Sequence, residues 1–184
     1  MTVKEGILAA AGELGIYEEV QAYLQGENSD GARETENLLR CFNLVENELA
    51  LDYLPLVREE EFQTQTGVLF FSELSRAAVR VLKVTDKWGN EAAFRLFPEY
   101  LKTEAQEGTV RYSYAPAQKG LEDESDFTFP ASPRLFGYGI AAEYCLANGL
   151  FEESAVWEQK YKAAIVAAYR NGRGNGKIQS RRWV

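Results

Sequence analysis

The last third of the chain most narrowly limits what this sequence can fold into. The stretch from Pro133 to Asn148 carries Gly137, Gly139, Ala141 and Ala142, so one side of a helix there offers little side-chain bulk. Glycine costs about 1 kcal/mol per helical position relative to alanine, so two glycines in one helix indicate close packing. We predict a helix at these residues whose small side chains pack against another helix of the chain or form a subunit contact.

A second helix is predicted directly after the Asn148-Gly149 turn, from Phe151 to Tyr169. Its apolar and aromatic side chains recur at separations of three or four, which makes one stripe along the helix. An aromatic stripe of this kind usually faces the core. The stripe consists of Trp157, Tyr161, Ala164, Ile165, Ala168 and Tyr169.

The C-terminal residues 171–184 differ from the rest of the chain in composition. They hold four basic residues and no acidic one, and three glycines fall between positions 172 and 176. Glycine-rich chain is flexible until a partner holds it. We predict a flexible arm that binds a partner, although phosphate contacts or a frayed end without a role remain alternatives. The candidate contact residues are Arg173, Lys177, Ile178, Arg181, Arg182 and Trp183.

The first part of the chain is also helical in pattern. Residues 3–24 carry spaced apolar residues around Gly12 and Gly15, which predicts two short helices or one kinked helix. Turn-forming residues at 27–31 precede a second apolar stripe. That stripe runs from Leu38 to Tyr53, and Pro55 should end its helix.

The middle of the chain changes to a strand pattern. Four runs rich in β-branched and aromatic residues are expected to be strands, and Asp86 to Asn90 resembles a hairpin turn. One small antiparallel sheet is the simplest arrangement of these runs. The runs are 62–66, 79–85, 92–96 and 109–114.

Together these patterns predict an α+β fold that is mainly α-helical. A helical body of about four main helices would carry a small antiparallel β insertion at about residues 60–115. We expect residues 1–170 to form a single domain, followed by the flexible arm at 171–184. A chain of 184 residues can bury about 70% of its extended surface, which is enough for one core.

The residue types argue against enzymatic chemistry. The chain has no histidine, which removes Ser/His and Cys/His nucleophilic pairs and most catalytic zinc sites. Cys41 and Cys145 lack metal-ligand spacing and are expected to be buried free thiols. The acidic run from Glu122 to Asp126 is expected to be a solvated loop. We predict no enzyme, no catalytic residue, no cofactor and no metal site.

The net charge of −8 is unevenly distributed. Residues 1–61 hold 14 acidic residues against four basic ones, so the body repels phosphate and general nucleic-acid binding is not expected there. The N-terminus lacks a signal-peptide pattern, and no apolar run approaches the roughly 18 residues that cross a membrane. We therefore expect cytoplasmic synthesis and no membrane contact.

With these residues placed, the chain resembles the head-to-tail adaptor proteins (neck, connector or tail-accessory proteins) of tailed bacteriophages, as encoded by a prophage of a Gram-positive host. The resemblance covers most of the length and rests on the order and spacing of packing residues rather than on one motif. Its carriers are the opening helices, the segment from Leu44 to Leu56, the strand from Val110 to Pro116, and the block from Gly139 through Trp157 to Tyr161.

The resemblance implies a non-enzymatic virion structural protein that forms an oligomeric ring between portal and tail. DNA would pass through its channel without sequence-specific binding, and its partners would be the portal and the tail or neck proteins. Members of this family often grip the portal with a C-terminal extension, which corresponds here to residues 171–184. The location implied is the host cytoplasm during assembly and then the virion neck.

Three other functions stay open at the level of sequence. The chain could be a soluble cytoplasmic protein-interaction module of phage or bacterial origin. It could also be a small acid/base enzyme that uses Glu and Tyr residues in a cleft, which requires convergent carboxylates in a concave pocket. A DNA-binding regulator is the third alternative, and it requires binding at low salt.

Overall fold

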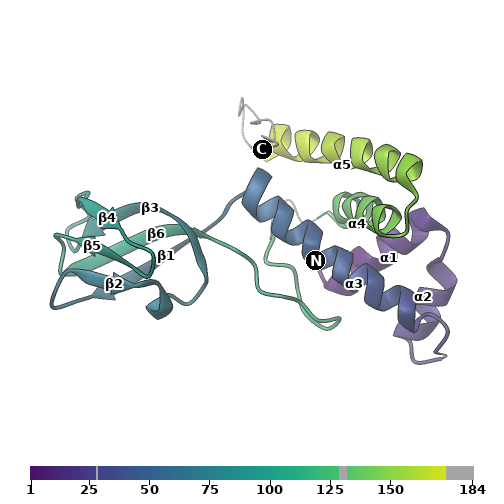
Figure 1. The fold of residues 1–184 in the computed structure, drawn as a ribbon, viewed down its shortest axis with the longest axis horizontal. Helices are drawn as coiled ribbons and strands as arrows, with labels where there is room; N and C mark the ends of the chain where they lie inside the picture. Colours follow the sequence, from purple (N-terminus) through teal and green to yellow (C-terminus); the bar gives the residue numbers. More distant parts are fainter. Residues whose placement is uncertain (28, 129–131, 173–184) are drawn as a thin grey trace. The chain divides into compact units, whose positions relative to one another are not determined.

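The computed structural model describes residues 1–27, 29–128 and 132–172, and the chain forms two compact units (Figure 1). The helical unit comprises Met1–Leu49 and the chain from Ala117 onward. The β unit comprises Ala50–Pro116. The β unit is therefore inserted between the first and second parts of the helical unit.

The balance of secondary structure differs from the prediction. Within the described residues the fold is α+β, with five α-helices, 48% helical content in all, and about 23% strand in two small antiparallel sheets. The predicted fold, mainly helical with about four main helices and a small insertion, is therefore wrong. The helix count is five because Gly15, whose φ of 75° lies in the left-handed region, divides the first helical stretch into two helices, which is one of the two forms predicted for it. The strand content is higher than expected because two strands, at 68–70 and 100–103, were not predicted.

The helical unit begins with α1 (Val3–Leu14), α2 (Tyr17–Leu24) and α3 (Ala32–Glu48), and a π-helical turn at Leu49–Tyr53 follows α3. Thr2 and Glu5 cap α1 reciprocally, since the Glu5 backbone N–H donates to Thr2 Oγ1 and the Thr2 N–H donates to Glu5 Oε2. The chain returns from the β unit to α4 (Pro133–Ala147) and α5 (Phe151–Gly172). The α5 helix continues two residues into the segment predicted as the arm.

The core of the helical unit is built around aromatic rings. Phe42 of α3 and Phe136 of α4 stack with ring centroids 5.2 Å apart, and Phe127 meets Phe136 edge-on at 6.2 Å. Ile7 of α1 and Ile140 of α4 are also fully buried. Segments far apart in the sequence therefore share one apolar interior.

The β unit contains two three-stranded antiparallel sheets. The first has the order β1-β6-β3, with β1 (Leu56–Gln63), β6 (Glu107–Tyr114) and β3 (Ala78–Asp86), and the second has the order β2-β5-β4. Its strands are β2 (Val68–Phe70), β5 (Tyr100–Thr103) and β4 (Phe94–Leu96). Side chains from both sheets form one core cluster of Phe62, Leu69, Val81, Val84, Leu101, Ala105, Val110 and Tyr112.

The predicted hairpin turn forms, but the strands on either side of it do not pair with each other. Asp86 Oδ1 accepts hydrogen bonds from the backbone N–H groups of Trp88 and Asn90, at 2.9 and 2.8 Å. Only one bridge, between Thr85 and Glu91, continues the pairing. Because β3 pairs with β6 and β4 pairs with β5, the expected single sheet is two sheets.

Candidate protein-interaction surfaces

The small-residue face of α4 lies inside the helical unit. A Cβ atom on Gly137 would lie 3.1 Å from Ala9 Cβ, and one on Gly139 would lie 2.8 Å from Val45 Cγ1 and 2.9 Å from Tyr161 Cε2. The neighbouring α1, α3 and α5 helices therefore approach α4 as closely as glycine permits.

Ala141 and Ala142 share this environment. Ala141 is fully buried and Ala142 is 7% exposed, and both glycines of this helix are buried as well. All four small residues are thus covered by their own subunit. The residues predicted for the partner-binding arm, in contrast, lie outside the described part of the chain. These are Arg173, Lys177, Ile178, Arg181, Arg182 and Trp183.

An exposed apolar surface occurs at the turn between α4 and α5. Leu146, Leu150 and Phe151 are 49%, 45% and 68% exposed, and we call them the turn patch. The turn depends on Gly149, whose φ of 75° lets the chain reverse, and the Leu150 N–H donates to the Cys145 carbonyl at 2.9 Å. Three large apolar side chains are therefore held at the surface by a tight turn.

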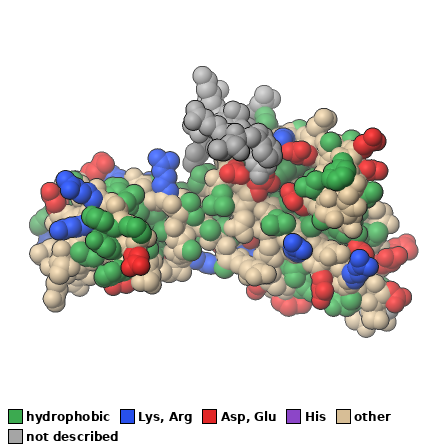
Figure 2. All heavy atoms as spheres, viewed as in Figure 1, with side chains coloured by type: hydrophobic (Ala, Val, Ile, Leu, Met, Phe, Trp, Pro, Cys, Tyr) green, Lys and Arg blue, Asp and Glu red, His purple; other side chains and the backbone are tan. Residues whose placement is uncertain are grey.

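The charge beside the turn patch is negative. Glu152 and Glu153 follow Phe151 directly, are exposed, and form no ion pair with any residue that the structure describes. Acidic residues in the first turn of a helix also stabilise it, because they interact favourably with the helix dipole. Figure 2 shows acidic side chains beside hydrophobic ones over the end of the helical unit where α5 begins.

A second exposed apolar surface lies on the β unit. The Phe97 and Tyr100 rings stack with centroids 4.6 Å apart, and Phe70 meets Tyr100 edge-on at 5.7 Å. Phe70 and Phe97 are 43% and 39% exposed. We call these three side chains the aromatic patch. They lie on the outer side of the β2-β5-β4 sheet, because Leu69 and Leu101 between them are buried in the core.

Two basic side chains lie beside the aromatic patch, and one exposed acidic residue, Glu99, lies between Phe97 and Tyr100 in the sequence. Arg95 of β4 lies directly opposite Lys102 of β5, and both are exposed. Neither forms an ion pair with any described residue. Like charges on directly opposite strand positions are destabilising, so the fold itself gains nothing from this pair. Figure 2 shows hydrophobic side chains with Lys and Arg side chains, and some acidic ones, around them on the visible face of the β unit.

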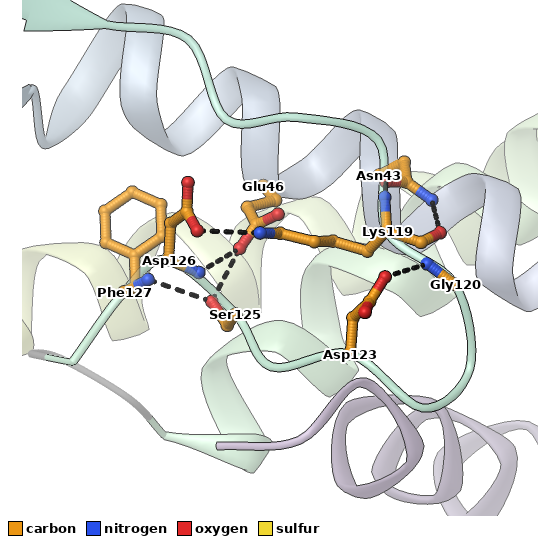
Figure 3. Close-up of polar contacts among 8 residues, drawn as sticks. All are labelled: Asn43, Glu46, Lys119, Gly120, Asp123, Ser125, Asp126 and Phe127. Carbon is orange, nitrogen blue, oxygen red and sulfur yellow. Dashed lines mark hydrogen bonds and ion pairs between the residues drawn. The ribbon is translucent and has the colours of Figure 1, made fainter. Parts of the chain in front are cut away.

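A buried polar network holds the segment that leads into α4 against α3 (Figure 3). Glu46 Oε1 accepts hydrogen bonds from Ser125 Oγ at 2.7 Å and from the Asp126 N–H at 2.9 Å. Lys119 Nζ pairs with Asp126 Oδ1 at 2.7 Å, and both side chains are only 9% exposed. Asn43 of α3 accepts from the Lys119 N–H at 2.6 Å. The network therefore fastens two distant parts of the chain.

The electrostatics of this network are costly. Glu46 is 1% exposed, and its Oε2 has no hydrogen-bond partner among the described residues. Burial raises the pKa of Glu46, although hydrogen bonds from Ser125 and the Asp126 backbone oppose this rise. The predicted solvated loop is wrong at Ser125 and Asp126, since α3 covers this half of it. Nothing in the local sequence marks Glu46 as their partner.

The β unit contains a carboxylate, Glu60, whose pKa is shifted in the opposite direction. Glu60 accepts hydrogen bonds from the Tyr112 hydroxyl at 2.5 Å, from the Ser75 hydroxyl and from the Ser75 N–H, and Arg58 lies 3.0 Å away. Burial alone would raise the pKa of Glu60, but these contacts together lower it. Glu60 thus ties the loop after β2 to the β1-β6 pair.

The remaining reactive side chains are held in unreactive states. Both cysteines are free and buried as predicted, and burial raises the pKa of Cys41 to about 11. Burial and a hydrogen bond to Glu34 raise the pKa of Tyr144 to about 12. Among the described residues, no group of three or more His, Cys, Asp or Glu side chains could hold a metal ion.

Comparison with known proteins adds no relative. No protein-family model matches this chain, and no curated protein matches it. Within the described residues, no helix combines the length and the apolar character that crossing a bilayer requires.

Proposed function

We propose that this protein is a non-enzymatic structural protein of a tailed bacteriophage, a head-to-tail adaptor that forms a ring between portal and tail. Its partners would be the portal protein, the tail or neck proteins and further copies of itself. It would be synthesised in the host cytoplasm and end in the virion neck, where DNA passes without sequence-specific contact.

One observation supports this proposal above the others. The helical unit exposes the turn patch beside Glu152 and Glu153, and the β unit exposes the aromatic patch beside Arg95 and Lys102, and none of these four forms an ion pair with another described residue. Exposed apolar groups gathered in this way are typical of protein-interaction sites. A ring subunit needs two different surfaces, one for each neighbour, because a heterologous contact joins unlike faces. Such contacts form a closed ring when the rotation between neighbouring subunits closes.

The test is quantitative mass spectrometry of purified, nuclease-treated particles after induction of the lysogen that carries this gene. We expect the chain at a copy number comparable to that of the portal protein. Abundance in the lysate with absence from intact particles would contradict the adaptor proposal. That result would instead support a soluble interaction module.

The basic C-terminal segment gives the proposal a second test. Removing residues 173–184 leaves all of α5 in place, so the thermal stability of the helical unit should change little. When only the truncated protein is expressed, purified particles should not contain it, because the removed segment is proposed to bind the portal. Normal incorporation of the truncated chain would contradict this role.

A further inference from the structure

We propose that the aromatic patch of one copy binds the turn patch of a second copy. This contact deepens the ring assembly proposed above, since it names the two surfaces that meet between neighbouring subunits. It does not depend on the phage assignment, because a homo-oligomer of any kind could use it.

The two patches match in their apolar parts. Phe70 and Phe97 leave ring area uncovered on one surface, and Leu150 and Phe151 leave apolar area uncovered on the other. Burying such side chains supplies the main favourable term in protein association. Aromatic residues near the centre of an interface also tend to carry much of the binding energy.

The two patches also match in charge. Arg95 and Lys102 lie opposite each other without an acidic partner among the described residues, and Glu152 and Glu153 lie beside Phe151 without a basic one. Joining the surfaces would relieve the like-charge repulsion on the sheet. Complementary charges at the rim of an apolar contact mainly set the choice of partner and the rate of association.

The proposed contact is heterologous. The two patches are different surfaces of the chain, so after the first contact one copy retains its turn patch and the other retains its aromatic patch. Successive copies therefore add in the same direction. Each patch has only three large apolar side chains, so a single contact should be weak, and assembly should require a high local concentration.

Cross-linking between two variants that each carry one introduced cysteine tests the contact. Phe97→Cys and Leu150→Cys proteins are mixed at the highest soluble concentration and treated with a short bismaleimide. Because each protein carries only one introduced thiol, a link between positions 97 and 150 must join two copies. We expect peptide mass spectrometry to find this mixed link at least tenfold more often than either variant linked to itself.

The matched control places the thiol on the other sheet. Glu59 of β1 has a side chain that is 61% exposed, so Glu59→Cys offers an accessible thiol outside the aromatic patch. Mixed with Leu150→Cys, it should give only background links. The native thiols of Cys41 and Cys145 are buried, and unmodified protein gives their contribution.

Charge reversal tests the pairing independently of the apolar groups. Adding Arg95→Glu and Lys102→Glu to the Phe97→Cys protein should reduce the mixed link at least tenfold. Adding Glu152→Lys and Glu153→Lys to the Leu150→Cys protein should then restore it. Circular dichroism confirms that each variant is folded, and all four changed residues are exposed.

The outcomes separate this contact from the adaptor proposal. Absence of the mixed link, predominance of links between identical positions, or failure of the reversed charges to restore the link would overturn the contact. If the protein is absent from particles but forms the 97–150 link, and the reversed charges restore that link, the contact is supported and the adaptor function is contradicted. A chain present in particles without the link keeps the adaptor function and loses this contact.

Discussion

The two units use their aromatic residues in opposite ways. In the helical unit Phe42 and Phe127 both contact Phe136 inside the core, where each of the three is at most 2% exposed. In the β unit Phe70, Phe97 and Tyr100 contact one another on the outside of a sheet. The first cluster stabilises a fold, and the second leaves apolar area open to a partner.

The difference follows from the size of the elements. Helices of eight to 22 residues give the helical unit several long faces to bury, whereas β2, β4 and β5 have only three or four residues each. Short strands offer one or two inward positions, so a small sheet cannot bury all of its large side chains. The surplus aromatic residues of this sheet therefore stay at the surface, where the proposed contact would cover them.

The largest expected effect breaks the helical core alone. Phe136→Ala should lower the free energy of unfolding of the helical unit by about 3–5 kcal/mol, because it removes a fully buried ring that contacts two others. Hydrogen exchange followed peptide by peptide should show lost protection in α4 and unchanged protection in β6. Phe97→Ala, at the surface, should change the free energy of unfolding of either unit by less than about 0.5 kcal/mol. Equal loss of protection in α4 and β6 would mean that the units unfold together.

The next effect concerns the close approach of helices to α4. Gly139→Ala should destabilise by about 1–3 kcal/mol, because the added methyl group meets Val45 and Tyr161 closer than 3.0 Å. Gly12→Ala is the matched control, since the same change on exposed α1 meets only Tyr17, at 3.9 Å. It should stabilise by about 0.4–1 kcal/mol. Thermal unfolding measures both, and equal signs would contradict the tight packing of α4.

The third prediction is that the stabilities of the two units depend on pH in opposite directions. Glu46 has a raised pKa in the folded state, so its contribution to stability is fully present below about pH 4.5 and is lost as the pH rises through the raised value. Glu60 has a lowered pKa, so its contribution is present above about pH 4.5 and is lost as the pH falls through the lowered value.

Acidification should therefore weaken the β unit through Glu60 while the contribution of Glu46 to the helical unit increases. Urea unfolding at several pH values, followed by hydrogen exchange in α3 and β1, measures the two responses. Glu46→Gln should flatten the pH dependence of the helical unit alone, and Glu60→Gln that of the β unit alone. A Glu46→Gln profile parallel to the unmodified protein would show that this carboxyl group does not titrate as inferred.

The smallest expected effect sharpens the contrast between stability and binding. Arg95→Glu places opposite charges across from each other on β4 and β5, which should stabilise the β unit by about 0.2–1 kcal/mol. The same change should weaken cross-linking to the turn patch. Lys83→Glu on β3 changes the charge equally but lies on the other sheet, so adding it to the Phe97→Cys protein should leave the yield of the 97–150 link unchanged. A destabilised Arg95→Glu protein would mean that the basic pair contributes to the fold.

Long periodic segments were predictable from the sequence. The predicted helix from Pro133 to Asn148 corresponds to α4, and the strand predicted at 109–114 lies within β6. Both have enough repeats for the apolar period to be clear. The strand predicted at 62–66 was misplaced, because β1 covers Leu56–Gln63 and its charged Arg58 to Glu61 run hides the strand pattern.

Features created by tertiary contact were not predictable. Ser125 and Glu46 are 79 positions apart, and no local pattern links a glutamate of a helix to a loop serine. The three-residue β2 and four-residue β5 are too short for alternation to stand out, so the aromatic patch was missed as well. The local signal of a shared sheet face was the two-residue spacing of Arg95 and Phe97 and of Tyr100 and Lys102.

The pairing of β1 with β6 has an evolutionary consequence. Leu56, at the first position of β1, lies directly opposite Tyr114, at the last position of β6. Such partners are about 4.5–5.5 Å apart, a gap that a turn of a few residues can bridge. A single deletion between these positions would leave a continuous gene for the helical unit, and a single insertion could have introduced the β unit. One genetic step at this point would therefore add or remove the aromatic patch together with the whole β unit, while the core residues of the helical unit stay the same.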